Sequence, residues 1–121
     1  ERCLAAGIAA VRPGGRLGDV GAAIVAVARA HGCGVVRDYG GHGIGRSMHM
    51  DPHVGHVGVA GKGVRLRPGM AFTIEPMITL GSPRTRLLDD GWTVVTADGR
   101  WTAQAEHTVL VTPEGVEVLT G

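Results

Sequence analysis

The chain has 121 residues, so it is one domain or a piece of one, and it is long enough to bury a modest core. Its formal net charge of +1 argues against nucleic acid or an acidic membrane surface as a partner. The sequence shows no secretory signal and no apolar run of about 18 residues, so we expect a soluble cytosolic protein without a membrane span.

Two amphipathic helices are expected first. Apolar residues recur at helical spacing in a first segment, at Leu4, Ile8 and Val11. They do so again in a second segment, at Leu17, Val20, Ile24 and Val27. Pro13-Gly14-Gly15 ends the first helix. Asp19 suits the first turn of the second helix, and Gly32 is placed to cap its C-terminus.

The middle of the chain is expected to be mostly loop. Val35-Val36 opens a short strand, and residues 40–68 are rich in glycine and histidine, which is typical of loops. The alternation in residues 71–75 then predicts a strand with its apolar residues on one face. Thr73 and Glu75 lie on the opposite face of that strand.

Further strands are expected near the C-terminus. Trp92–Thr96 and Gln104–Val111 are expected to be strands joined across the turn pair Asp98-Gly99. The end of the second of these strands then forms a hairpin with Val116–Leu119. Two helices followed by mostly antiparallel strands predict an α+β fold.

Three short motifs combine residue types that bind divalent metal ions. Tyr39–His49 contains His42 and His49 in a segment with four glycines. A glutamate follows in each of Phe72–Met77 and Gln104–Thr108. Imidazole with two carboxylates suits Zn, Mn, Fe or Co. A mixed His and Glu set that leaves coordination positions open is typical of catalytic rather than structural metal sites.

Each of these residues, taken alone, has a simpler interpretation. His42 alone is better explained as a hydrogen-bonded histidine in a glycine-rich turn, and His49 as an exposed loop histidine. Glu75 and Glu106 would be solvated charges on strand faces. Glu75 nevertheless has apolar neighbours on both sides, which is a poor setting for an unpaired charge.

Together, the three motifs resemble those of type I methionine aminopeptidases, which are pita-bread metallopeptidases. The resemblance runs along essentially the whole chain. It implies that residues 1–121 are the C-terminal half of that catalytic domain, with two helices packed on a mostly antiparallel, curved sheet. The family holds two divalent ions, Co, Mn, Fe or Zn, with five ligands. By resemblance His42, Glu75 and Glu106 are three of them, and two Asp ligands belong to a preceding half. The start at Glu1 rather than Met also suggests a truncated or processed chain.

The resemblance also implies roles in catalysis and substrate binding. Glu75 is expected to act as general base for the water shared by the metals, and Glu106 to bridge the metals. His49 is expected to bind the substrate by donating a hydrogen bond to the scissile carbonyl and its oxyanion. Met48 and Trp92 are expected to form walls of the pocket for the substrate's N-terminal methionine side chain.

The remaining histidines match none of the motifs. His31, His53 and His56 are expected to be ordinary surface or turn histidines. His107 should point away from Glu106 in a regular strand, so it is left out of the ligand set.

The implied activity is removal of the N-terminal methionine from nascent polypeptides, near the ribosome and in the cytoplasm. The full-length protein is expected to be a monomer that needs its N-terminal half. Neither a membrane nor a specific nucleic acid is expected as a partner. Cys3 and Cys33 are expected to stay reduced, because such a protein works in a reducing compartment.

Three other interpretations share the same fold. Xaa-Pro aminopeptidases and prolidases usually carry glycine after Ile-Glu-Pro, where this chain has Met77. Type II methionine aminopeptidases insert a helical subdomain between the two glutamates, whereas only 30 residues separate Glu75 from Glu106. The third is a pita-bread binding module without catalysis, against which the presence of all three expected ligands argues.

Overall fold

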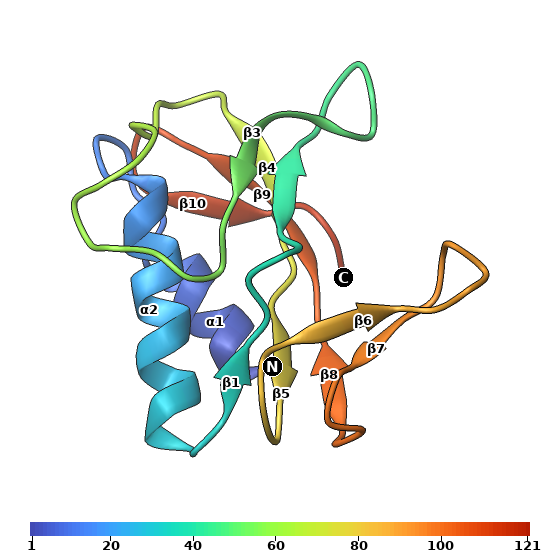
Figure 1. Ribbon diagram of the computed structural model, residues 1–121. Coiled ribbons are helices and arrows are strands. Elements are labelled where there is room, and N and C mark those ends of the chain that lie inside the picture. Colours follow the sequence, from blue (N-terminus) through green and yellow to red (C-terminus); the bar gives the residue numbers. More distant parts are fainter.

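Two helices and ten short strands make up the computed structural model, which describes all 121 residues (Figure 1). The helices are α1 (Arg2–Ala9) and α2 (Leu17–Ala30), and they pack against each other on one side of the strands. The strands are β1 (Gly34–Val35), β2 (Gly41–Gly43), β3 (Met50–Val54), β4 (Ala71–Ile74), β5 (Met77–Thr79), β6 (Thr85–Leu87), β7 (Val94–Thr96), β8 (Thr102–Gln104), β9 (His107–Val111) and β10 (Val116–Val118).

Helix α2 begins and ends as its sequence predicts. The Asp19 carboxylate accepts hydrogen bonds from the backbone N–H of Gly61 at 2.7 Å and of Arg16 at 2.9 Å. The bond from Arg16 satisfies a free N–H at the helix start. Both bonds hold the pKa of Asp19 below its ordinary value, and the bond from Gly61 contributes most. Gly32 follows the helix with φ +67°, a conformation that favours glycine.

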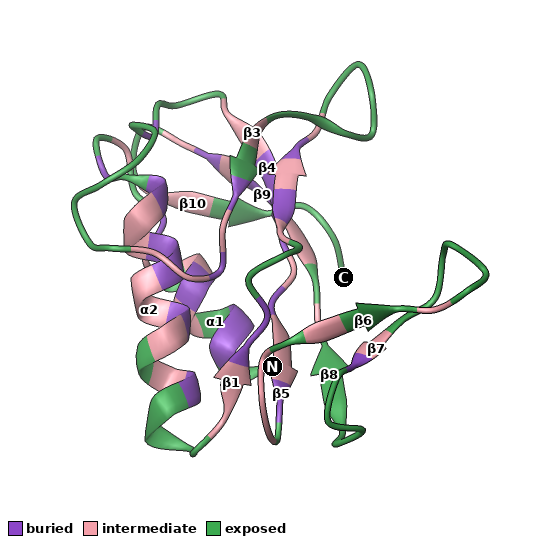
Figure 2. Cartoon of the chain, viewed as in Figure 1, coloured by how far each residue is buried: buried purple, intermediate pink, exposed green.

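The strands form three antiparallel sheets, which confirms the predicted α+β class. The main sheet has five strands in the order β10-β9-β4-β2-β3. A second sheet has the order β1-β5-β8, and β6 pairs with β7 alone. The β6–β7 hairpin extends away from the rest of the molecule, and most of its residues are exposed or half-buried (Figures 1 and 2). Neither helix has the length and apolar character needed to span a membrane.

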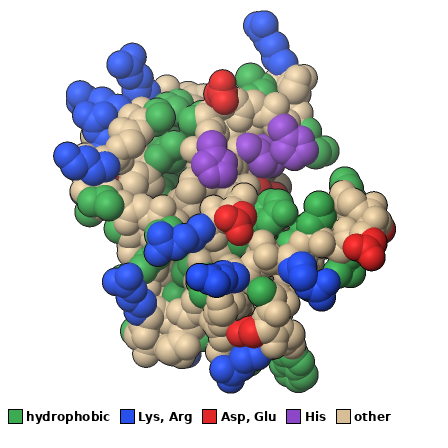
Figure 3. Space-filling view, in the orientation of Figure 1, with side chains coloured by type: hydrophobic (Ala, Val, Ile, Leu, Met, Phe, Trp, Pro, Cys, Tyr) green, Lys and Arg blue, Asp and Glu red, His purple; other side chains and the backbone are tan.

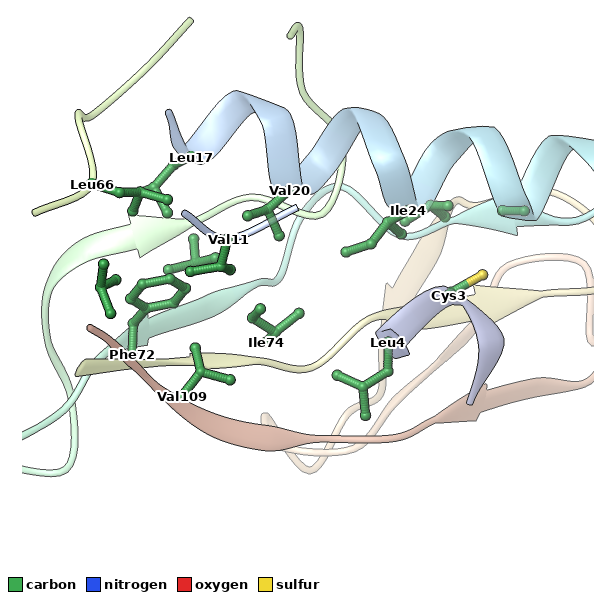
Figure 4. Close-up of a cluster of buried hydrophobic side chains, with 14 residues drawn as sticks. Cys3, Leu4, Val11, Leu17, Val20, Ile24, Leu66, Phe72, Ile74 and Val109 are labelled. Atoms are coloured by element: carbon green, nitrogen blue, oxygen red, sulfur yellow. The ribbon is translucent and has the colours of Figure 1, made fainter. Parts of the chain in front are cut away.

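The hydrophobic core lies between the two helices and the main sheet (Figure 4). Phe72 and Ile74 on β4 and Val109 on β9 are fully buried and face α2 residues such as Ile24. The alternation predicted for residues 71–75 is therefore confirmed, and Thr73 and Glu75 are left for the opposite face. Cys3 and Cys33 are both free, as expected.

Residues 40–68 are mostly loop, as expected, but they also contain two strands, β2 and β3. Strand β2 pairs with both β3 and β4 and contributes Gly41 and Gly43 to the main sheet. A Cβ atom at Gly41 would come within 2.1 Å of the Thr73 carbonyl oxygen. The glycines that suggested a loop thus allow β2 to lie close against β4.

The predicted pairing of Trp92–Thr96 with Gln104–Val111 is wrong. Strand β7 pairs with β6 instead, and Trp92 lies before it in a turn where its N–H binds Asp90. The segment Gln104–Val111 is not one strand, because Gln104 ends β8 and His107 begins β9, and these two strands pair in different sheets. The predicted final hairpin is confirmed, since β9 pairs with β10.

Candidate metal centre

Two glutamates lie at a corner where the chain passes twice between the main sheet and the second sheet. Glu75 and Pro76 connect β4 to β5, and Glu106 lies in the connection from β8 to β9. The facing pairs on the two sides of this corner are Ile74 with His107 and Met77 with Gln104. The two pairs have the same register, so the residues between them also face each other in order. This register places Glu75 opposite Glu106. Residues that face each other across an antiparallel pair project to the same side, and like charges there repel unless a cation lies between them.

His42 comes from β2 and meets Glu75 beside this corner. The distance from His42 Nε2 to Glu75 Oε1 is 3.6 Å, and both side chains are less than one-fifth exposed. His42 Nδ1 lies 2.9 Å from the Gly43 carbonyl oxygen and must donate to it, because a carbonyl only accepts. A neutral His42 ring then carries its lone pair on Nε2, directed at a carboxylate oxygen. Two acceptors that face each other in this way suit a shared metal ion.

Two further side chains hold the carboxylate of Glu75. The Thr73 hydroxyl accepts a hydrogen bond from the His42 backbone N–H at 3.0 Å and donates to Glu75 Oε1 at 2.8 Å. Gln104 donates from Nε2 to Glu75 Oε2 at 3.1 Å. The sequence motifs do not mark Thr73 or Gln104 as site residues. The alternation of residues along a strand could have indicated them, because it places Thr73 on the same face as Glu75 and Gln104 on the same face as Glu106.

His49 lies beside His42 at the mouth of a cavity. The two ring centroids are 4.3 Å apart, with the ring planes at 50°. The cavity has a volume of about 470 Å³. Its lining residues are Val36, Tyr39, Gly40, His42, His49, Glu75, Met77, Thr85, Val94, Val95, Thr96, Thr102, Ala103 and Gln104. Histidine side chains are grouped on this face of the molecule, close to acidic ones (Figure 3).

Three of the residues predicted for the site do not line this cavity. Glu106 is exposed, and the chain holds no group of three or more His, Cys, Asp or Glu residues placed to share one ion. Met48 is 68% exposed and Trp92 is 86% exposed. Of the predicted ligands, the fold therefore brings His42 and Glu75 together and places Glu106 at the position facing Glu75. The functional roles of Met48, Trp92 and Glu106 stay predictions.

His56 is buried, so its assignment as an ordinary surface or turn histidine is wrong. It is only 1% exposed, and its Nε2 accepts a hydrogen bond from the Glu75 backbone N–H at 3.0 Å. Burial, with a smaller contribution from His53, lowers the pKa of His56 to about 4. His31 and His53 are exposed, as expected. His107 is hydrogen-bonded to Thr120, away from the cavity.

Known proteins resemble this chain along its whole length. Methionine aminopeptidase A of Synechocystis sp. is 59% identical over 120 residues, which are 99% of this chain and 47% of that protein. The crystal structure of methionine aminopeptidase from Rickettsia prowazekii superposes with a TM-score of 0.94 at 50% identity, over 96% of this chain and 47% of that one. The chain spans about half the length of the curated relatives it matches.

More distant structures share the fold alone. Prolidase from Pyrococcus furiosus is 23% identical and superposes with a TM-score of 0.67, over 98% of this chain and 29% of that one. These neighbours confirm the predicted pita-bread architecture. The profile of metallopeptidase family M24 matches residues 1–113, which include His42, Glu75 and Glu106. By this match, and with a fold that the solved structures share, the chain belongs to metallopeptidase family M24.

Proposed function

We propose that residues 1–121 form the C-terminal half of the catalytic domain of a methionine aminopeptidase and supply part of its metal site. The observation that carries this proposal is the pairing of His42 Nε2 with Glu75 Oε1 at 3.6 Å beside a cavity. It is supported by the 59% identity with a protein named methionine aminopeptidase along 99% of the chain.

The donor atoms fit a divalent cation. We assign His42, Glu75 and Glu106 as ligands, and the facing positions of the two glutamates suit a carboxylate pair around a shared charge. Nitrogen and oxygen donors of this kind accept Co, Mn, Fe or Zn. Two Asp ligands from a preceding half would complete a site for two metal ions.

The residues of this chain would act on the substrate from fixed positions. When bound, the metals would lower the pKa of a shared water towards neutrality and polarise the scissile carbonyl. Glu75 would accept a proton from the attacking water, while Thr73 and Gln104 hold its carboxylate in place. His49, beside the His42 ring, would donate a hydrogen bond to the carbonyl oxygen and stabilise the oxyanion.

The cavity supports a substrate with an unbranched apolar side chain. Apolar walls from Val36, Met77 and Val94 lie next to the polar groups of the site. We assign Met48 and Trp92 as further walls, completed by the preceding half. The substrates would be nascent polypeptides with a small second residue, processed near the ribosome in the cytoplasm by a protein that is a monomer at full length.

The prolidase alternative is less well supported. Met77 follows the Ile-Glu-Pro motif and lines the cavity, where prolidases usually carry glycine. The superposition on the Rickettsia methionine aminopeptidase, at a TM-score of 0.94, is also closer than that on the Pyrococcus prolidase, at 0.67.

The test uses a joined protein, in which this chain follows the N-terminal half of Synechocystis methionine aminopeptidase A. With Co²⁺ or Mn²⁺ added, the joined protein should release free methionine from Met-Ala and Met-Gly peptides. A Glu75→Gln variant should release none, because it lacks the general base. A Glu117→Gln variant, which changes an exposed glutamate on β10, should keep full activity.

Two results would contradict the proposal. Hydrolysis of Ala-Pro without release of methionine would favour the prolidase interpretation. A joined protein that binds metal and hydrolyses neither peptide would favour a binding module without catalysis.

A further inference from the structure

The mechanism proposed above does not use His56, although this ring is almost completely buried and touches a proposed metal ligand. His56 lies in the segment that follows β3, 19 residues before Glu75 in the sequence. Its Nε2 is 3.0 Å from the Glu75 backbone nitrogen. The contact joins the β3 end of the main sheet to the corner that carries the two glutamates.

The Glu75 backbone N–H needs a partner that the sheets do not provide. Strand β4 ends at Ile74, and the ladder between β4 and β9 ends with the same residue. Pro76 follows without an N–H, and β5 begins only at Met77. The corner thus leaves the Glu75 amide outside both sheets, and His56 supplies the acceptor.

This contact fixes the tautomer of the His56 ring. A backbone N–H only donates, so Nε2 must carry a lone pair, and a neutral ring then carries its proton on Nδ1. Nδ1 is buried and has no hydrogen-bond partner. A leucine of similar size would fill the same space without an unpaired donor. Packing alone therefore does not account for a histidine at this position, whereas the bond to Glu75 does.

We infer that His56 is a positioning residue for Glu75, which holds the backbone of this metal ligand at the corner and thereby sets the direction of its carboxylate. The inference rests on the proposed role of Glu75 as a ligand. Residues that orient metal ligands in this way typically change metal affinity by about 10- to 100-fold when they are replaced.

The test compares three substitutions in the joined protein. His56→Gln places an amide oxygen as many bonds from Cα as Nε2 and so restores the acceptor. His56→Leu keeps the volume and removes the acceptor, and His56→Asn places its oxygen near the Nδ1 position instead. Thr79→Val is the matched control, because it removes a fully buried hydroxyl that binds the Gly81 carbonyl and does not line the cavity.

Binding of CoCl₂, followed by calorimetry and by the visible spectrum of bound Co²⁺, is the main measurement. His56→Leu and His56→Asn should weaken binding by about 10- to 100-fold, and His56→Gln should bind as the wild type does. Thr79→Val should lower the melting temperature without changing Co²⁺ affinity. Wild-type affinity in His56→Leu, or a loss in His56→Gln equal to that in His56→Leu, would overturn the inference.

A second measurement does not depend on metal binding. Long-range ¹H–¹⁵N correlation spectra of this chain and of the joined protein, both without metal, should show the His56 ring with its proton on Nδ1. The Glu75 amide resonance should shift strongly in His56→Leu and little in His56→Gln. A ring protonated on Nε2 would overturn the inference. A joined protein that fails to bind Co²⁺ but shows the Nδ1 tautomer would contradict the proposed function and leave the His56–Glu75 contact supported.

Discussion

The ring of His49 lies against the ring of His42 at a centroid distance of 4.3 Å, although seven positions separate the two residues in the sequence. His42 is partly buried and has its Nδ1 bound to the Gly43 carbonyl, whereas His49 is exposed at the cavity. The two histidines therefore have different surroundings, and we expect different roles for them.

Replacing His49 should affect catalysis without affecting the metal. In the joined protein, His49→Ala should lower kcat about 10²- to 10³-fold, as expected for the loss of one oxyanion donor. Metal content, measured by atomic emission, should equal that of the wild type. Loss of metal in this variant would instead make His49 a ligand.

Replacing Glu106 should remove metal and activity together. Its position opposite Glu75 in the register of the flanking pairs is the reason for assigning it as a ligand. Glu106→Ala should therefore abolish release of methionine and reduce the bound metal per chain. Glu117→Ala, an exposed glutamate on β10, provides the matched control. An unchanged rate in Glu106→Ala would count against Glu106 as a ligand.

The Thr73 hydroxyl connects the two partners of the candidate centre. It accepts from the His42 backbone and donates to Glu75, so Thr73→Val keeps the shape of the side chain and breaks both bonds. We expect metal binding to weaken by about 10- to 100-fold. Thr79→Val should not have this effect, and equal losses in the two variants would indicate a general loss of stability.

The stability of the chain should depend on pH through Asp19. Its pKa in the fold lies below its ordinary value of 3.8, so the unfolded chain takes up the proton first as the pH falls. The stabilisation is present above this value and is lost as the pH falls through the lower pKa of the folded state. Asp19→Asn should flatten the acid side of a plot of melting temperature against pH. An acid side that Asp19→Asn leaves unchanged would contradict this prediction.

The 121-residue chain by itself should be a weak metal binder. It brings two of the three predicted ligands together, and large apolar side chains such as Trp101 are more than four-fifths exposed. We expect little or no release of methionine and concentration-dependent self-association, measured by analytical ultracentrifugation. Robust turnover by this chain would show that it holds a complete site, with Asp51 and His53, which are both exposed, the first substitute ligands to replace.

Local patterns predicted much of the fold and part of the site. The helical spacing of residues such as Leu17 and Ile24 and the alternation around Phe72 depend on neighbours in the sequence, and the structure follows them. His42 and Glu75 stand in motifs that the family resemblance made recognisable, and the fold brings these two residues together.

What could not be predicted depends on contacts between distant segments. The glycines of β2 suggest a loop until β4 is known to lie beside them. The pairing of β7 with β6, rather than with the strand that follows it, is a choice between partners that turn residues alone do not determine. Nothing near His56 in the sequence indicates burial. Pro76, which follows Glu75 and cannot continue a ladder, is the one signal that the Glu75 N–H needs an acceptor from outside the sheets.

The shared register around Glu75 and Glu106 affects how easily the backbone at this corner can unfold locally. Both residues are anchored at each end by ladder pairs, Ile74 with His107 and Met77 with Gln104, and Ile74 is itself part of the core. Glu75 thus lies between β4 and β5, each of which has a strand on both of its edges, whereas Glu106 follows β8, an exposed strand at the edge of its sheet. Amide hydrogen exchange at Glu75 should therefore require opening of these central strands, whereas exchange near Glu106 should need only the release of β8.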